Sequence, residues 1–205
     1  MRKIILVATL LILGTNVHAQ FLQGWGIFVG ATAGKQVIKI NEPKEKDKSK
    51  YLLRYNAEVF GEFGQDPFLR WVSELQYNVK GAKWQYPSGD VKEVNQYIAW
   101  NNYLMYRYEM VSIIPYAKIG PRLEYNFAST ENPALNKFHV TGALGAGVEI
   151  VPYGNVGFIT EAFWVPDLTH SYKDSYGYLN QHCWELRVGL KFKIHKGGSC
   201  PAAQT

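Results

Sequence analysis

The chain has 205 residues, a formal net charge of +5, and 14 Tyr, 10 Phe, 6 Trp and 19 Gly. Such a length allows one ordinary domain. The positive charge is mild, and no basic stripe with interleaved aromatic residues follows one helical face, which argues against nucleic acid as a partner. The high aromatic and glycine content, without a sustained helical period, favours β structure, and bilayer interfaces favour Trp and Tyr.

Residues 1–19 have the pattern of a secretory signal peptide. Arg2 and Lys3 precede an apolar run over 4–13, and Val17 and Ala19 stand at the positions that small residues occupy before a cleavage site. The run is too short to span a bilayer as a helix, and no later apolar run approaches about twenty residues. We therefore expect signal-peptide-dependent export, a mature chain starting near Gln20, and no transmembrane helix in it.

Eight later segments alternate apolar and polar residues with a period of two, which predicts β-strands. In chain order they cover about 24–35, 51–63, 69–80, 94–107, 116–127, 138–150, 158–164 and 183–194. Strands of soluble sheets have about five or six residues, whereas membrane-spanning strands need about nine to eleven. Most of the eight segments reach the longer range, so the pattern favours strands that cross a membrane.

The connections between these segments alternate in length. Tight turns rich in Gly, Pro, Asn and Asp are predicted at 64–67, 108–112 and 151–155, and longer polar loops at about 35–50, 85–93, 128–137 and 167–181. Outer-membrane barrels have short periplasmic turns and longer outer loops. We predict an all-β fold, an eight-stranded antiparallel up-and-down transmembrane β-barrel over 20–194 in the cell outer membrane, with a periplasmic C-terminal tail over 195–205.

The charged residues of the clear strands lie on the face opposite the apolar residues. A charge on the lipid face near the midplane costs about 2–4 kcal/mol, so these side chains are expected inside. An eight-stranded barrel is just wide enough for side chains to fill, which predicts a polar, filled lumen and no open pore. A soluble barrel of the lipocalin type would show the reverse, an apolar cavity and charges outside. The predicted lumen charge network is Arg54, Glu58, Glu62, Arg70, Glu74, Lys118, Arg122, Glu124, Glu149, Glu161, Glu185, Arg187 and Lys191, and the predicted lipid-interface aromatic residues are Trp25, Trp71, Trp100, Trp164, Trp184 and Phe192.

Two stretches resemble the small outer-membrane β-barrel proteins of Gram-negative bacteria, of the PorT-like and OmpX/OmpA-like kind. They are "YLMYRYEMVSIIPYAKIGPRLEYNF" (103–127) and "LRVGLKFKI" (186–194), and the likeness extends over about 21–194. The resemblance implies an eight-stranded barrel in the outer membrane. It also implies, for some members, a part in secretion or envelope assembly.

Few residues suggest chemistry. Asp167, His170 and Ser171 fall together in the last long loop, and some outer-membrane barrels are lipid-modifying enzymes with His and Ser at the outer rim. Sequence proximity does not bring a nucleophile and a base together, so this enzyme remains the alternative. His139 is expected as a hydrogen-bonded lumen residue, and no metal site or cofactor is predicted.

Two further features have plain interpretations. Cys183 and Cys200 are expected to be free thiols, because the strand that follows Cys183 carries them too far apart for a disulfide. The loop 39–50 contains both lysines and acidic residues, and the simpler interpretation is a solvated loop. The more specific hypothesis is that the loop binds lipopolysaccharide phosphates through Lys44, Lys46, Lys48 and Lys50.

These observations favour a monomeric, non-enzymatic barrel that works by contact, as a structural protein, an interaction surface or a secretion accessory of the envelope. Its expected partners are outer-membrane lipids, with lipopolysaccharide and other envelope or secretion proteins as candidates. A narrow channel is the lesser alternative, because the lumen is crowded.

Overall fold

The computed structural model describes residues 22–40, 45–86, 89–130, 136–151, 154–173 and 177–194. The predicted signal peptide, the whole predicted tail over 195–205, which includes Cys200, and Lys44 lie outside these ranges, and the side chains of Lys46 and Lys48 are outside the described part as well. No helix in the described part of the chain is long and apolar enough to cross a membrane.

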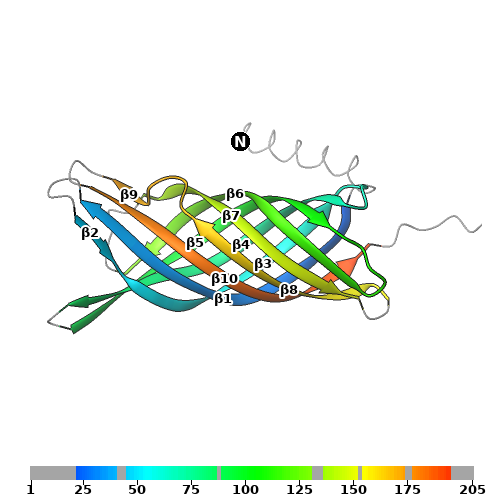
Figure 1. The fold of residues 1–205 in the computed structure, drawn as a ribbon, viewed down its shortest axis with the longest axis horizontal. Helices are drawn as coiled ribbons and strands as arrows, with labels where there is room; N and C mark the ends of the chain where they lie inside the picture. The colour runs from blue at the N-terminus through cyan, green and yellow to red at the C-terminus, as the bar shows by residue number, and fades with distance from the viewer. Residues whose placement is uncertain are drawn as a thin grey trace, which may run out of the picture.

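All regular structure in the described residues is β-strand, arranged as a closed barrel (Figure 1). Each strand pairs antiparallel with its neighbour, and β1 pairs with β10 along almost its whole length, which closes the ring. Eight long strands form the wall, and two short ones, β2 and β9, extend it at one end. The strands are β1 (Leu22–Ile40), β2 (Glu45–Lys48), β3 (Lys50–Phe63), β4 (Leu69–Tyr86), β5 (Gly89–Arg107), β6 (Ile113–Ser129), β7 (Phe138–Ile150), β8 (Val156–Pro166), β9 (Tyr172–Lys173) and β10 (Gly177–Lys193).

The two ends of the barrel differ. The connections 64–68 and 108–112 lie at one end, together with the end of β7, the start of β8, the start of β1 and the end of β10; we call this the turn end. The opposite end, which carries β2, β9 and the β4–β5 hairpin, is called the loop end (Figure 1). The eight-stranded, up-and-down, all-β prediction is confirmed.

Several strands are longer than predicted at the loop end. β4 and β5 stay paired up to Tyr86 and Gly89, so the predicted loop over 85–93 is wrong. β1 continues to Ile40, and β10 begins at Gly177 inside the predicted loop over 167–181. The backbone ladder continues there, although the side chains no longer separate into a lipid face and a lumen face. The apolar period therefore ends before the strand does.

Burial alternates along the strands, with apolar side chains exposed and polar ones buried. In β3, Val59 is 52% exposed while Glu58 is 4% exposed; in β10, Val188 is 53% exposed while Arg187 is fully buried. A water-soluble protein buries its apolar face instead. This inside-out partition suits an exterior in contact with lipid and an interior sealed by paired charges.

Glycines on the inner face of β1 make room for large side chains from other strands. A Cβ on Gly26 would lie 2.5 Å from the ring of Phe60, and one on Gly30 would lie 2.9 Å from the side chain of Arg187. Gly189 in β10 does the same for Phe28, at 2.5 Å. The small residues of the ring thus determine where the bulky interior groups fit.

Pro121 stands in the middle of β6, where a proline removes a ladder hydrogen bond. The β6–β7 pairing continues through Pro121 and Gly142 without a break. On the other side, the β5–β6 pairing passes from Asn101 paired with Arg122 to Leu104 paired with Ile119, and the two positions between are skipped. The missing N–H of Pro121 therefore falls at the interruption of the β5–β6 ladder.

Gly120, next to Pro121, has almost no room for a side chain. A Cβ there would lie 2.0 Å from the carbonyl oxygen of Asn102 in β5. We expect Gly120→Val to destabilise the folded barrel by about 1–3 kcal/mol or more, because overpacking forces the two backbones apart. Urea unfolding in phospholipid vesicles measures this. Gly142→Val, where a Cβ meets only the side chain of Leu168 at 3.5 Å, is the control, and equal effects would contradict the prediction.

Candidate functional site

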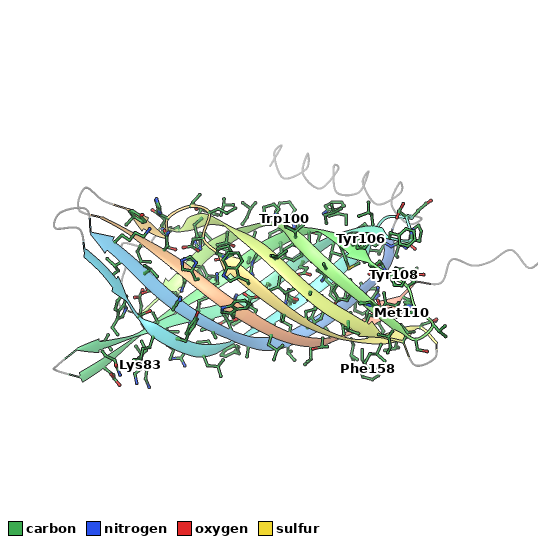
Figure 2. The ribbon with its side chains drawn as sticks, in the orientation of Figure 1. Lys83, Trp100, Tyr106, Tyr108, Met110 and Phe158 are labelled. Atoms are coloured by element: carbon green, nitrogen blue, oxygen red, sulfur yellow. The ribbon has the colours of Figure 1, made fainter. Side chains whose placement is uncertain are left out.

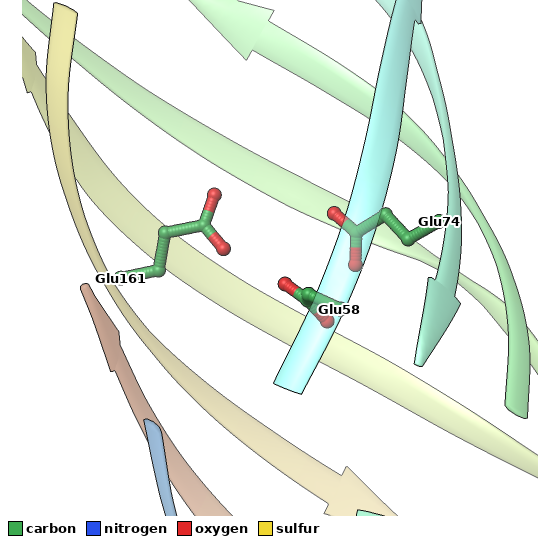
Figure 3. A group of neighbouring side chains, drawn as sticks. All are labelled: Glu58, Glu74 and Glu161. Carbon is green, nitrogen blue, oxygen red and sulfur yellow. The ribbon is translucent and has the colours of Figure 1, made fainter. Parts of the chain in front are cut away.

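The middle of the lumen holds three carboxylates and two cations. Glu58, Glu74 and Glu161 project from β3, β4 and β8 toward one another (Figure 3), with carboxylate oxygens within 4.8 Å of one another. The guanidinium of Arg187 contacts all three, at 3.1 Å from Glu74, 3.2 Å from Glu161 and closer still to Glu58. Lys118 Nζ lies 2.9 Å from Glu74 and 2.5 Å from Glu161.

Among the described residues, these three carboxylates form the group whose oxygens lie close enough together to bind one cation. Hard cations such as Ca²⁺ bind carboxylate oxygens of this kind. In this barrel Arg187 and Lys118 already contact these oxygens, and the Tyr116 hydroxyl donates to Glu161 at 2.6 Å. The positive side chains therefore stand where a metal ion would, and the cluster does not fit a metal site.

Aromatic rings enclose the two middle cations. Lys118 Nζ lies 5.5 Å from the ring centres of Phe28 and Tyr116 and 5.6 Å from that of Phe60. The Arg187 guanidinium carbon lies 4.0 Å from the ring centre of Phe163. Rings at this distance attract cations and exclude water, which strengthens the ion pairs they surround.

A second charged layer lies nearer the loop end. Arg122 Nη1 lies 3.0 Å from Glu185, and Lys80 Nζ lies 2.7 Å from Glu124. His139 Nε2 lies 2.8 Å from Glu124, so the structure places this histidine among the lumen charges, as the sequence predicts. Asn78 and Gln76 donate to Glu185 at 2.7 and 3.1 Å. Each carboxylate in this layer therefore has at least two donors.

A third layer lies near the turn end. Arg107 Nη1 lies 2.7 Å from Glu62, and Arg70 Nε lies 3.3 Å from the same carboxylate. Lys191 Nζ contacts Glu62 and also lies 2.8 Å from Glu149. Between this layer and the middle one remains a cavity of about 10 Å³. That volume suffices for roughly one water molecule, so the lumen is filled in this region.

Twelve of the thirteen residues predicted for the lumen charge network are buried inside, and one is not. Arg54 is partly exposed, and its guanidinium donates a 3.4 Å hydrogen bond to the backbone carbonyl of Leu53. It lies where the β3–β4 register is irregular, between Tyr51 and Asn56. Arg54 keeps the inward parity of β3 and pairs with the buried Thr32 of β1, but it lies toward the loop end and makes no ion pair among the described residues.

Other lumen residues were not in the predicted set. Lys80 and Arg107 are buried and paired, and both stand at the polar positions of their strands, so strand parity could have identified them. Phe28, Phe60 and Phe163 also point inward. Because these side chains are apolar, the sequence alone suggests that they face lipid. Only their position in the alternation, on the same face of the strand as neighbouring glutamates and glycines, indicates that they face the lumen.

The loop residues Asp167, His170 and Ser171 do not form a catalytic relay. Ser171 is buried and donates directly to Asp167 at 2.5 Å, and the backbone N–H of Gln181 donates to the same carboxylate at 2.7 Å. Burial raises the pKa of Asp167. His170 instead pairs its Nδ1 with the Asn180 side chain at 2.7 Å. A nucleophile needs its base within hydrogen-bond reach, and here the histidine is bonded elsewhere.

The predicted lipid-interface aromatic residues all lie on the outer face. Trp25 stacks on Phe192 with ring centres 4.7 Å apart, and both belong to the turn end of their strands. Trp164 and Trp184 pair across β8 and β10. Figure 2 shows Trp100 between the two ends of the barrel, away from either rim. Its Nε1 donates to Ser73 at 3.0 Å, which satisfies the indole N–H where lipid offers no acceptor.

Cys183 is a buried free thiol on the inner face of β10, next to the lumen charges. Its predicted lack of a disulfide agrees with this placement, while Cys200 lies outside the described residues.

A closed eight-stranded ring with an apolar exterior and an ion-paired lumen is the architecture of outer-membrane β-barrels. Comparisons with family models and with curated proteins find no match. Among solved structures, the outer-membrane protein OprG from Pseudomonas aeruginosa aligns with a TM-score of 0.55 at 12% identity, over 85% of this chain and 98% of that one. AlkL, solved by solid-state NMR in DMPC bilayers, aligns with a TM-score of 0.50 at 12% identity, over 87% and 93% of the two chains.

Neisserial surface protein A aligns over 82% of this chain and 97% of its own, at 14% identity and a TM-score of 0.48. At such identities the likeness concerns the fold alone. The chain thus has the fold of the small eight-stranded outer-membrane β-barrels, and the resemblance seen in its sequence motifs is confirmed at that level.

Proposed function

We propose that this protein is a non-enzymatic barrel of the outer membrane, exported by its signal peptide, that acts by contact as a structural, interaction or secretion-accessory protein of the envelope. The observation that supports this most is the filled lumen. Three layers of paired charges, together with rings around Lys118 and Arg187, take up the interior that a channel would need to keep open. The surfaces left for function are then the two ends and the lipid-facing wall.

The enzyme alternative has little geometric support. Ser171 donates its hydroxyl hydrogen bond to the Asp167 carboxylate, and His170 is held by Asn180 and by the ring of Tyr178, whose centre lies 4.3 Å from that of the imidazole. The loop instead extends the barrel wall. Thr169 and Leu168 donate backbone hydrogen bonds to Val140 and continue the sheet past the end of β8.

Two measurements test the proposal. Purified protein in planar bilayers is expected to give no resolved single-channel steps, because no layer of the lumen leaves room for a hydrated ion. The lipid A profile of cells lacking the gene is expected to match that of the parent strain. Regular conductance steps would support a channel instead. An altered lipid A profile that His170→Ala also produces would support the enzyme.

The partners that we propose include lipopolysaccharide, bound at the loop end. Lys35 Nζ lies over the ring of Tyr51 at 5.0 Å, and Lys39 Nζ over that of Tyr178 at 5.2 Å. Cations held on aromatic rings at a bilayer surface attract anionic head groups, at about 1 kcal/mol per basic residue.

Replacing Lys35, Lys39 and Lys50 together by Gln is therefore expected to weaken binding to lipopolysaccharide vesicles about tenfold or more at low salt. Replacement of Lys193, at the turn end, serves as the control. Unchanged affinity of the triple variant would remove lipopolysaccharide from the proposed partners.

A further inference from the structure

We propose that the mouth of the lumen at the turn end binds a carboxylate group, presented from the periplasm by a peptide or protein chain. The mouth is a pocket of about 330 Å³. Its charged lining comes from four different strands and the β5–β6 turn, so it is assembled only in the closed ring. The charged residues that line it are Glu62, Arg70, Arg107, Glu109, Lys191 and Lys193.

Positive charge is in excess at this mouth. The four cations share three carboxylates, since Glu149 lies directly behind and contacts Lys191 at 2.8 Å and Lys193 at 3.4 Å. One of the three, Glu109, is half exposed, and water screens its charge. Asp66, in the turn before β4, is exposed and also interacts with Arg70, and water screens its charge in the same way. Among the buried groups of the mouth, Arg70, Arg107 and Lys191 face only Glu62 and Glu149, so one cation is in excess. Arg122 and Lys80, nearer the loop end, face two carboxylates of their own.

Arg70 is that cation. Its side chain is only 9% exposed, and its ion pair is made through Nε, 3.3 Å from Glu62. Its Nη1 is shielded from solvent and has no hydrogen-bond partner in the described part of the chain. Glu62 is also paired with Arg107 and Lys191, so its single negative charge faces three cations. A guanidinium has five donors in a fixed fork that matches the two oxygens of a carboxylate, so Arg70 is left able to bind one more anion.

The location and the charge favour a carboxylate from water over a lipid phosphate. The mouth is formed by inward-facing side chains and opens along the barrel axis, and lipid head groups meet the outer wall instead. Short turns of outer-membrane barrels lie in the periplasm, which gives this end access to periplasmic chains. The excess of one positive charge matches a monoanion, while a phosphomonoester carries about −1.5 to −2.

This inference is independent of what the loop end contacts, so it can fail while the proposed function holds. The test uses the folded protein in detergent micelles with ¹⁵N-labelled arginine. Acetyl-trialanine with a free C-terminal carboxylate, the same peptide as its amide, and inorganic phosphate are the three probes. The Nε–H resonance of Arg70 is expected to shift saturably with the acid, with affinity at least about tenfold weaker for the amide.

Arg70→Gln is expected to abolish saturable binding of the acid, and Arg70→Lys to weaken it, since the charge remains without the fork. Both variants leave Glu62 paired with Arg107 and Lys191, which supports folding. Lys83→Gln, at the loop end and paired with Asp90, is the control and should bind normally. Equal responses to acid and amide, or tighter binding of phosphate than of the acid, would overturn the proposal.

Discussion

Arg187→Ala is expected to destabilise the folded barrel by about 3–5 kcal/mol, because removing one partner of a buried ion pair leaves the other charge unpaired. Arg187 is fully buried and contacts Glu58, Glu74 and Glu161 at once, so three carboxylates lose a counter-charge together. Lys118 would remain as the cation of this layer, but its ion pairs are with Glu74 and Glu161 and leave Glu58 without a counter-charge in contact. The free energy of unfolding in urea, measured in phospholipid vesicles, gives the loss.

A double variant separates the ion pair from the packing. Glu58→Gln added to Arg187→Ala should recover part of the lost stability, because it removes the carboxylate that Arg187 contacts most closely. Arg54→Ala is the matched control, since Arg54 is a partly exposed arginine whose contact is a backbone carbonyl, and its effect should stay within about 0.5 kcal/mol. A loss below about 1 kcal/mol for Arg187→Ala would show that the middle layer contributes little.

Val188→Arg is expected to destabilise the barrel in lipid by about 2–4 kcal/mol, the cost of a cation on the lipid face near the midplane. Val188 is 53% exposed and lies on β10 midway between Trp184 and Phe192. An arginine at such an exposed position would be harmless if the outer wall faced water. It is costly here because the outer wall faces hydrocarbon.

Val111→Arg is the control for that substitution. Val111 lies in the turn between β5 and β6 and its side chain is completely exposed, so an arginine there reaches water and the expected change is within about 0.5 kcal/mol. Unfolding in vesicles and the shift in gel mobility between folded and unfolded forms report both variants. Equal stability of the two would mean that the wall around Val188 is in contact with water.

The sequence by itself determined the strands and their two faces. Alternation is a local property, because successive side chains of a strand point to opposite sides whatever the strand pairs with. The parity of Glu58 with Glu62, or of Glu185 with Arg187, therefore placed each pair on one face before any partner strand was known. Length then distinguished membrane-spanning strands from those of a soluble sheet.

Only the tertiary structure decided which charged side chains form ion pairs, and where along a strand the alternation no longer predicts burial. Arg122 pairs with Glu185 across the lumen, 63 positions away, because the tilt and stagger of the closed ring bring β6 and β10 to the same level. The same stagger leaves Arg70 Nη1 at the mouth without a partner among the described residues, and it leaves Arg54 toward the loop end without an ion pair among them. Such pairings depend on the register of eight strands together, and no single segment carries that information.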